Sequence, residues 1–174
     1  IEKLLKQFVE NINLIIDHKD FSKVQISIKK NNYGNLIDPE TVTYLVNQAW
    51  DQCKKTFEDD KLIHILIDNY VIDKNNFNSL PKNLKCNIFS LDLSFISLSK
   101  KLIINLEQIL KKNQISLNQV VSAKYIKEFF INNDKDIFEM GKNIIEGCNN
   151  NEVLLVTRVK KNQGFFEKFF NFFK

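Results

Sequence analysis

Two long apolar runs in the middle of the chain constrain the fold more than any other feature of the sequence. Residues 62–72 are β-branched and aliphatic and begin apolar on both faces, which is typical of a strand in the centre of a sheet. Residues 88–98 alternate between two faces, one of them almost wholly apolar, and this period of two predicts a second long strand. A polar loop around Pro81 separates the two runs. We therefore expect a β-sheet built around these strands.

Helical patterns surround the strands. Residues 1–17 place apolar side chains at i, i+3, i+4 and i+7, which predicts a helix with one broad apolar face. Asp38 and Pro39 suit the cap and the first position of a helix that continues to Phe57. A third helix is expected over 99–112, capped by Ser99 and closed by Asn113 in a left-handed conformation.

Shorter strands complete the pattern. Residues 23–29 alternate polar and apolar side chains, 31–35 form a turn cluster, and a short strand follows the third helix at 115–123. This order of helices and strands predicts an α+β fold: a small two-layer domain with a mixed β-sheet and helices packed on one face. We expect three parts, an α+β domain over 1–130, a short helix (137–145) and strand (153–159) with a linker over 131–163, and an amphipathic helix over 164–174.

The composition excludes several classes of function. The four glycines never fall close enough together to form a P-loop or a GxGxxG dinucleotide site, so we expect no cofactor. The net charge of +4 is mild, and Arg158 is the only arginine, which argues against a nucleic-acid partner. The three cysteines lack CxxC spacing, so we expect neither a disulfide scaffold nor a metal site. No apolar run reaches the roughly 18 residues of a spanning helix.

No arrangement of side chains predicts catalysis. His64 lies alone within a strand, and no Cys, Ser or second His stands at a motif spacing from it. Asp68 and Asp73 flank Tyr70 and could hold a cation, although a solvated strand end is the more common use of such residues. We therefore expect a non-catalytic protein with no metal.

The C-terminal stretch from Gly164 carries the clearest functional pattern. On a helix, its six phenylalanines fall within an arc of roughly 160° and leave the charged residues on the other side. An aromatic face with lysines beside it is typical of a helix that lies in the headgroup region of an anionic membrane. The alternatives are a helix docked in a protein groove and a helix packed on this domain's own core. The expected membrane-binding residues are Phe165, Phe166, Lys168, Phe169, Phe170, Phe172, Phe173 and Lys174.

The segment from His64 to Asp73 resembles a motif of the bacterial actin-like cell-division protein FtsA. That motif consists of His, two aliphatics, Pro, two variable residues, an aromatic, a variable residue, an aliphatic and Asp. His64, Tyr70, Ile72 and Asp73 match it, whereas Ile67 stands where the family has Pro. The family continues with a Pro-containing loop, matched by Pro81, and then a strand, a helix and a strand. Family glycines near the loop and at the helix end are replaced by Asn83, Cys86 and Asn113.

The resemblance covers roughly residues 1–125 and concerns the strand–helix–strand–strand subdomain that FtsA carries in place of one actin subdomain. FtsA proteins also end in an amphipathic membrane-targeting helix, which residues 164–174 resemble. The resemblance implies protein–protein contacts in septum assembly at the cytoplasmic face of the inner membrane, with FtsA-like subunits or later division proteins as partners. It leaves open whether the chain is a piece of an FtsA-like protein or a reduced relative. A soluble protein-binding or dimerisation domain, whose terminal helix is a core or interface element, remains the alternative.

Overall fold

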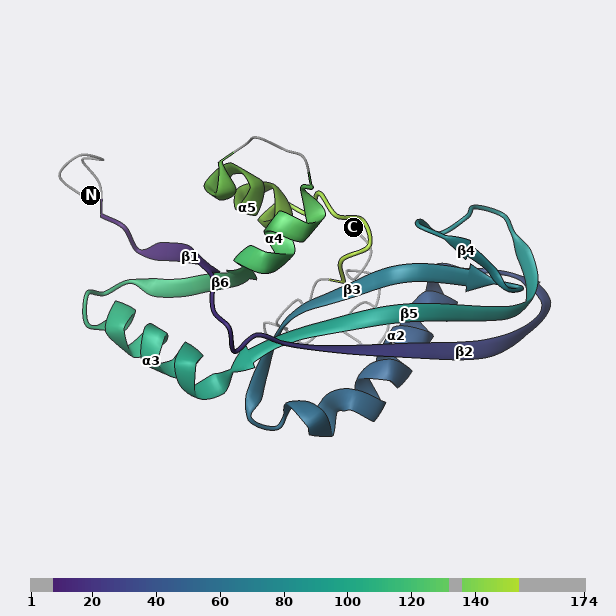
Figure 1. Cartoon of the computed structure of the whole chain (residues 1–174), viewed down its shortest axis with the longest axis horizontal. Coiled ribbons are helices and arrows are strands. Elements are labelled where there is room, and N and C mark those ends of the chain that lie inside the picture. Colours follow the sequence, from purple (N-terminus) through teal and green to yellow (C-terminus); the bar gives the residue numbers. More distant parts are fainter. Residues whose placement is uncertain (1–7, 132–135, 154–174) are drawn as a thin grey trace, which may run out of the picture.

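A computed structural model describes residues 8–131 and 136–153, and within them the chain has the expected α+β fold (Figure 1). Strands and helices are interspersed along the chain, and the six strands of the described residues form two separate sheets. In chain order the elements are β1 (Asn11–Ile16), β2 (Ser22–Leu36), α2 (Pro39–Cys53), the short 3₁₀ helix η1 (Lys54–Phe57), β3 (Asp60–Ile72), β4 (Asn75–Phe77), β5 (Lys85–Ser99), α3 (Lys100–Lys111), β6 (Ser116–Ser122), α4 (Ala123–Phe129) and α5 (Ile137–Ile145).

The larger sheet is antiparallel and has the strand order β2-β5-β3-β4. β5 pairs with β2 on one side and with β3 on the other along most of its length, so the two predicted long strands are neighbours in the centre of the sheet. β4 adds only a short pairing at the end of β3, from Tyr70 to Ile72. The side chains of β5 that face α2 are fully buried: Phe89, Leu91, Leu93 and Phe95.

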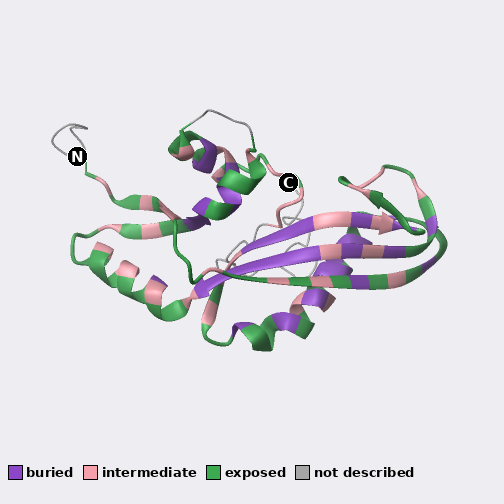
Figure 2. Cartoon of the chain, viewed as in Figure 1, coloured by how far each residue is buried: buried purple, intermediate pink, exposed green. Residues whose placement is uncertain are grey.

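Helix α2 covers one face of this sheet and begins where the sequence predicts. The Asp38 carboxylate accepts a hydrogen bond of 2.6 Å from the Thr41 backbone N–H, and Pro39 occupies the first turn, as expected for a capped helix start. Leu45 and Ala49 on its apolar face are completely buried against the strands. The resulting core appears in Figure 2 as stretches of buried colour in β3, β5 and α2.

The predicted helix over residues 1–17 is wrong in its described part, because Asn11–Ile16 forms strand β1. β1 pairs in parallel with β6, and Ile15 lies opposite Val121. Its β-branched, apolar residues satisfy a helical spacing and a strand equally well, so the choice is made by the partner strand rather than by local pattern. Ile15 packs between α4 and α5, and Ile16 packs toward α3, so both faces of this parallel pair are covered, as parallel sheets require.

Helices lie on both faces of the larger sheet, with α2 on one face and α4 and α5 on the other. Leu66 and Ile96 point away from α2 and pack against Tyr125 and Ile126 of α4 and Ile144 of α5. α4 itself was not expected from the sequence, whereas α5 begins and ends at the predicted residues. The second core therefore joins the two sheets through α4 and α5 (Figure 1).

Three turn predictions have different outcomes. Asn83 has a φ of 58°, which is the left-handed conformation that Asn tolerates best after Gly. The left-handed residue after α3 is Gln114, with a φ of 60°, and not Asn113. Residues 31–35 do not form a turn that ends the strand. Instead, the pairing of β2 with β5 is irregular there, and Gly34 has a φ of 76°.

Among the described residues, no helix has both the length and the apolar character needed to cross a membrane. Residues 154–174 lie outside the described residues, and with them all of the expected strand over 153–159 except Val153, the rest of the expected linker up to 163, and the amphipathic helix over 164–174.

Candidate functional site

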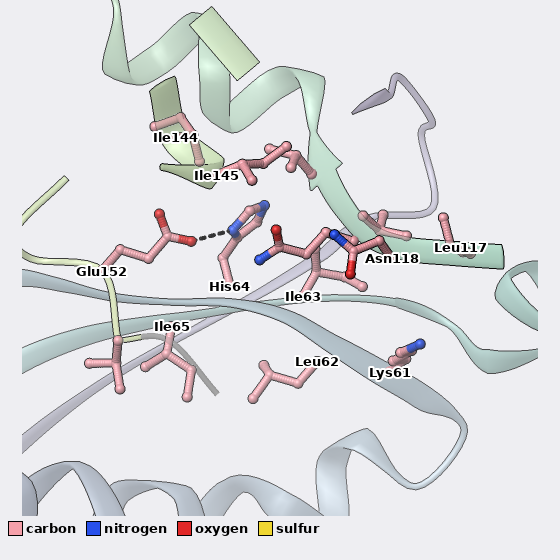
Figure 3. Close-up of a pocket in the computed structure, with 14 residues that line it drawn as sticks. Lys61, Leu62, Ile63, His64, Ile65, Leu117, Asn118, Ile144, Ile145 and Glu152 are labelled. Atoms are coloured by element: carbon pink, nitrogen blue, oxygen red, sulfur yellow. Dashed lines mark hydrogen bonds and ion pairs between the residues drawn. The ribbon is translucent and has the colours of Figure 1, made fainter. Parts of the chain in front are cut away.

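The candidate site is built around His64, the first residue of the motif from His64 to Asp73. β3 carries His64 at an irregularity of its pairing with β5, between Leu62 and His64. Figure 3 shows its ring on the side of β3 that faces Ile144 and Ile145 of α5, opposite to Ile65. The side chain is only 3% exposed, so its two ring nitrogens need partners within the protein.

Both ring nitrogens of His64 have such partners. Nε2 accepts a hydrogen bond of 3.0 Å from the backbone N–H of Ser122, at the junction of β6 and α4. An acceptor nitrogen carries no proton, so the neutral ring holds its proton on Nδ1. Nδ1 lies 2.7 Å from Oε1 of Glu152 and therefore donates to it (Figure 3).

Glu152 links His64 to α4. Its second oxygen, Oε2, accepts a hydrogen bond of 2.8 Å from the hydroxyl of Tyr125. That hydroxyl in turn accepts a bond of 2.7 Å from the side-chain amide of Asn149. The His64 and Tyr125 rings also pack with their centroids 4.6 Å apart. The chain of hydrogen bonds therefore runs unbroken from Asn149 to Ser122, and each member has a partner.

The surroundings keep Tyr125 protonated. Burial raises the pKa of its hydroxyl well above the usual range, and the Glu152 carboxylate adds to this increase, while the Asn149 hydrogen bond opposes it only partly. The hydroxyl thus acts as a hydrogen-bond donor to Glu152 and not as a base.

The set of Glu152, His64 and Ser122 has the residue types of a hydrolase triad, but its atoms are arranged differently. A triad needs a hydroxyl oxygen on the histidine nitrogen opposite to the acid. Here the atom at that position is the backbone nitrogen of Ser122, while the Ser122 hydroxyl accepts a 3.4 Å bond from the Tyr125 N–H as the cap of α4. The hydrogen bonds connect β3, β6, α4 and residues 149–152. They leave no free lone pair on His64 that could accept a proton from a substrate.

A groove of about 600 Å³ lies beside the cluster (Figure 3). Its walls are residues 61–65 of β3, residues 117–121 of β6, and Ile144 and Ile145 of α5. The volume falls within the usual range of small-ligand sites, roughly 300–1,000 Å³. Such sites present a few polar groups to their ligand, whereas His64 and Glu152 at this groove are already bonded to each other and to α4 or β6.

The other residues of the motif have separate positions. Tyr70 is buried in the core beneath α2, and its hydroxyl donates to Asn151 Oδ1 at 3.3 Å. Asp73 follows β3, and its carboxylate accepts from the backbone N–H groups of Asn87 and Ile88, at 2.8 Å in the shortest bond. Pro81 lies in the loop between β4 and β5. His64 and Tyr70 both bond to residues 151–152, whereas Asp73 closes the far end of β3.

The remaining candidates have structural surroundings within the part of the chain that is described. Asp68 accepts a 2.5 Å bond from Ser94, and Asp92 accepts a 2.6 Å bond from Ser27, on the sheet face away from α2. Cys53 is buried in the core as predicted, and burial raises the pKa of its thiol. Residues 8–131 and 136–153 contain no group of three His, Cys, Asp or Glu side chains suited to a metal. The expected membrane-binding residues, Phe165 to Lys174, lie outside the described residues.

Four members of the cluster were not expected from the sequence: Ser122, Tyr125, Asn149 and Glu152. They stand 58 to 88 residues after His64, so no local spacing links them to it. One signal was present, because Ser122 precedes a run of good helix formers and so predicts the start of α4. Nothing in the sequence pairs Glu152 with His64.

No protein-family model matches the sequence, and no curated protein matches it either.

Proposed function

We propose that the chain is a membrane-peripheral, non-catalytic interaction module that resembles part of FtsA and acts in bacterial septum assembly. Its partners would be the anionic lipid surface at the cytoplasmic face of the inner membrane, together with FtsA-like subunits or later division proteins. The observation that carries the proposal is the order of elements from β2 to β5. A strand, a helix and two long strands follow one another there, interrupted only by the short η1 and β4, which is the order that the resemblance implies.

The elements that follow β5 support the same proposal. The resemblance implies a helix and a closing strand after the second long strand, and α3 and β6 occupy these places. β6 pairs with β1, which precedes β2. The unit from β2 to β5 is thus inserted between two strands that pair with each other, as a subdomain placed within another fold would be.

The chemistry of the His64 cluster favours a binding role over a catalytic one. Its hydrogen bonds are satisfied internally: the Ser122 hydroxyl is used as a helix cap, and the Tyr125 hydroxyl donates to Glu152. A cluster whose hydrogen bonds are made within the protein stabilises the folded structure. The proposed activity therefore depends on surfaces and on the terminal phenylalanines, in agreement with the six-Phe face expected over 164–174.

A second candidate is favoured by one specific observation. Three large apolar side chains beside α4 and α5 are exposed, namely Phe129, Ile131 and Phe138, with 40%, 72% and 71% of their surface accessible. A terminal helix with an aromatic face could cover them, which would make this helix an element of the fold or of an interface between proteins.

Vesicle flotation combined with thermal unfolding separates the two candidates. The test variant replaces Phe166, Phe169 and Phe173 by Ser, and its matched control replaces Glu167 and Asn171 by Ser in the same segment. A membrane anchor predicts that only the phenylalanine variant fails to float with anionic vesicles and that its melting temperature stays unchanged. Equal flotation of both variants would contradict the proposal, and a lower melting temperature of the phenylalanine variant would favour the second candidate.

A further inference from the structure

Strand β2 forms one edge of the larger sheet. The strand order β2-β5-β3-β4 gives it a neighbour on one side only, and among the described strands none lies at its outer edge (Figure 1). The hydrogen bonds of residues 22–30 with the rest of the described chain go to β5 and, from the Gln25 side chain, to Asp68. An open edge presents unpaired N–H and C=O groups that readily pair with another strand.

The backbone directions in β3 and β5 determine which residues of β2 point outward. On β3, Ile67 uses its N–H and Ile65 its C=O for bonds with residues 151–153, on the side away from β5. Because these directions alternate along a strand, the backbone groups of Leu66 point toward β5, where Leu66 lies opposite Ser94. The backbone groups of Ser94 therefore point toward β3 and away from β2.

The outward residues of β2 follow from this direction. Gln25 lies opposite Ser94, so its N–H and C=O point away from β5 and out of the sheet. The same alternation directs the backbone groups of Lys23, Ser27 and Lys29 outward. Four alternate residues thus offer both a donor and an acceptor to an incoming strand. Past this stretch the pairing of β2 with β5 becomes irregular.

The side chains along this edge are basic on one face and apolar on the other. Lys23 and Lys29 are exposed, and residues 21–37 contain no Asp or Glu. Within the described part of the chain, neither lysine has an ion pair. On the opposite face Val24 and Ile26 are half-buried at the border of the core beneath α2. An incoming strand therefore meets positive charge on one face and apolar surface on the other.

The described carboxylates on the lysine face already have hydrogen-bond partners. Asp92 accepts a bond of 2.6 Å from the Ser27 hydroxyl and a second from Asn69. Asp68 accepts a bond of 2.5 Å from the Ser94 hydroxyl. These bonds hold the two carboxylates over β3 and β5, inside the outer edge where the lysines stand.

A second copy of β2 is a poor partner for this edge. Two antiparallel copies that overlap over residues 22–30 place Lys23 opposite Lys29 twice, and like charges directly opposite each other destabilise a sheet. Lysines on an edge strand deter pairing of this kind. A strand with acidic residues at the same two places gains attraction instead, because opposite charges in cross-strand pairs are stabilising.

We infer that the outer edge of β2 binds an extended acidic segment of a partner protein as an additional strand. The backbone of this segment bonds to the four outward residues of β2, and its apolar side chains cover Val24 and Ile26. Because Lys23 and Lys29 are six positions apart, the segment carries two acidic residues with the same separation. In strand addition, the main-chain bonds give affinity and the alternate side chains give specificity. The inference rests on the proposed role of the chain as an interaction module and names the chemistry of the partner segment.

Binding of a designed peptide to the full chain tests this inference. The probe is the end-blocked peptide Thr-Glu-Val-Thr-Val-Thr-Val-Glu-Thr, which places its glutamates opposite Lys23 and Lys29. In the control peptide, lysine replaces both glutamates. In low salt we expect the glutamate peptide to bind at least about tenfold more tightly than the lysine peptide, measured by fluorescence anisotropy.

Amide exchange followed by nuclear magnetic resonance locates the binding edge. The glutamate peptide should slow exchange at the outward N–H groups of Lys23, Gln25, Ser27 and Lys29 at least about tenfold, because each N–H gains an acceptor. Slower exchange confined to other strands would overturn the inference.

Charge reversal provides matched variants. K23E/K29E should bind the lysine peptide more tightly than the glutamate peptide, whereas K111E/K112E, with the same charge change on exposed lysines at the end of α3, should keep the original preference. Equal binding of both peptides to the unmodified chain, or binding of neither, would overturn the inference and leave the lysines as protection of the edge. So would a preference that K23E/K29E leaves unchanged. If K23E/K29E fails to fold, amide exchange in the unmodified chain decides. No vesicles are present, so this result is independent of the flotation experiment.

Discussion

Nδ1 of His64 lies 2.7 Å from Oε1 of Glu152, although the two residues are 88 positions apart in the sequence. Their side chains are only 3% and 8% exposed. The contact joins the central strand β3 to the last described turn of the chain. Because Glu152 also accepts from Tyr125, one carboxylate holds three parts of the fold in a fixed arrangement.

Removing the Glu152 carboxylate should therefore cost far more stability than removing an exposed one. E152A leaves the Nδ1–H of His64 and the hydroxyl of Tyr125 buried without an acceptor, and we expect a loss of about 3 kcal/mol in the free energy of unfolding. The matched control is E146A, which breaks the exposed pair of Glu146 with Lys142 at 3.6 Å and should cost at most about 0.5 kcal/mol. Urea unfolding measures both variants, and equal losses would show that the cluster does not stabilise the fold.

Most strands and helices of the fold could be predicted, because their patterns are local. β3 and β5 show in the sequence as long apolar or alternating runs, and α2 shows as Asp38 and Pro39 ahead of an apolar face. β1 could not be predicted, since its six residues suit either a helix or a strand until β6 lies beside them.

The site was predictable only at His64. The motif places this residue in a strand, and an isolated strand histidine is expected to be packed or hydrogen-bonded. Its partners depend on how β6, α4 and the turn at 149–152 fold back onto β3. That information lies in tertiary packing, and no spacing along the sequence encodes it.

Alkaline pH should weaken the contribution of Tyr125 to the stability of the folded protein. Burial raises the pKa of its hydroxyl in the folded protein, whereas in the unfolded chain it ionises near pH 10. Stability contributed by this group is therefore complete below about pH 10 and is lost as the pH rises above it, by about 1.4 kcal/mol per pH unit. The stability difference between the unmodified protein and Y125F should shrink from pH 8 to pH 11 in urea unfolding experiments. A stability difference that stays constant over this pH range would contradict the raised pKa of the Tyr125 hydroxyl.

The stability that the Asp38 cap of α2 contributes should show the opposite dependence on pH. The Thr41 N–H lowers the pKa of the Asp38 carboxyl below its usual range. A lowered pKa contributes stability that is present above the unfolded value of about 4 and is lost as the pH falls below it. D38A should cost about 1 kcal/mol at pH 7 and less at pH 3, whereas D38N keeps an acceptor and should remove the pH dependence. A D38A loss of the same size at both pH values would contradict the capping role.

Gly147 ends α5 in a conformation that only a few residues adopt easily. Its φ is 82°, its N–H donates to the carbonyl of Ile144 at 2.9 Å, and the next N–H, from Cys148, reaches Asn143 at 3.0 Å. A Cβ at this position would meet no atom within 4 Å, so a substitution acts through backbone strain alone. We expect G147A to lower the free energy of unfolding by about 1 kcal/mol, and G147N to cost less because Asn tolerates left-handed backbone. Thermal unfolding of the two variants checks this order, and the reverse order would show that side-chain contacts, and not the backbone, set the residue at this turn.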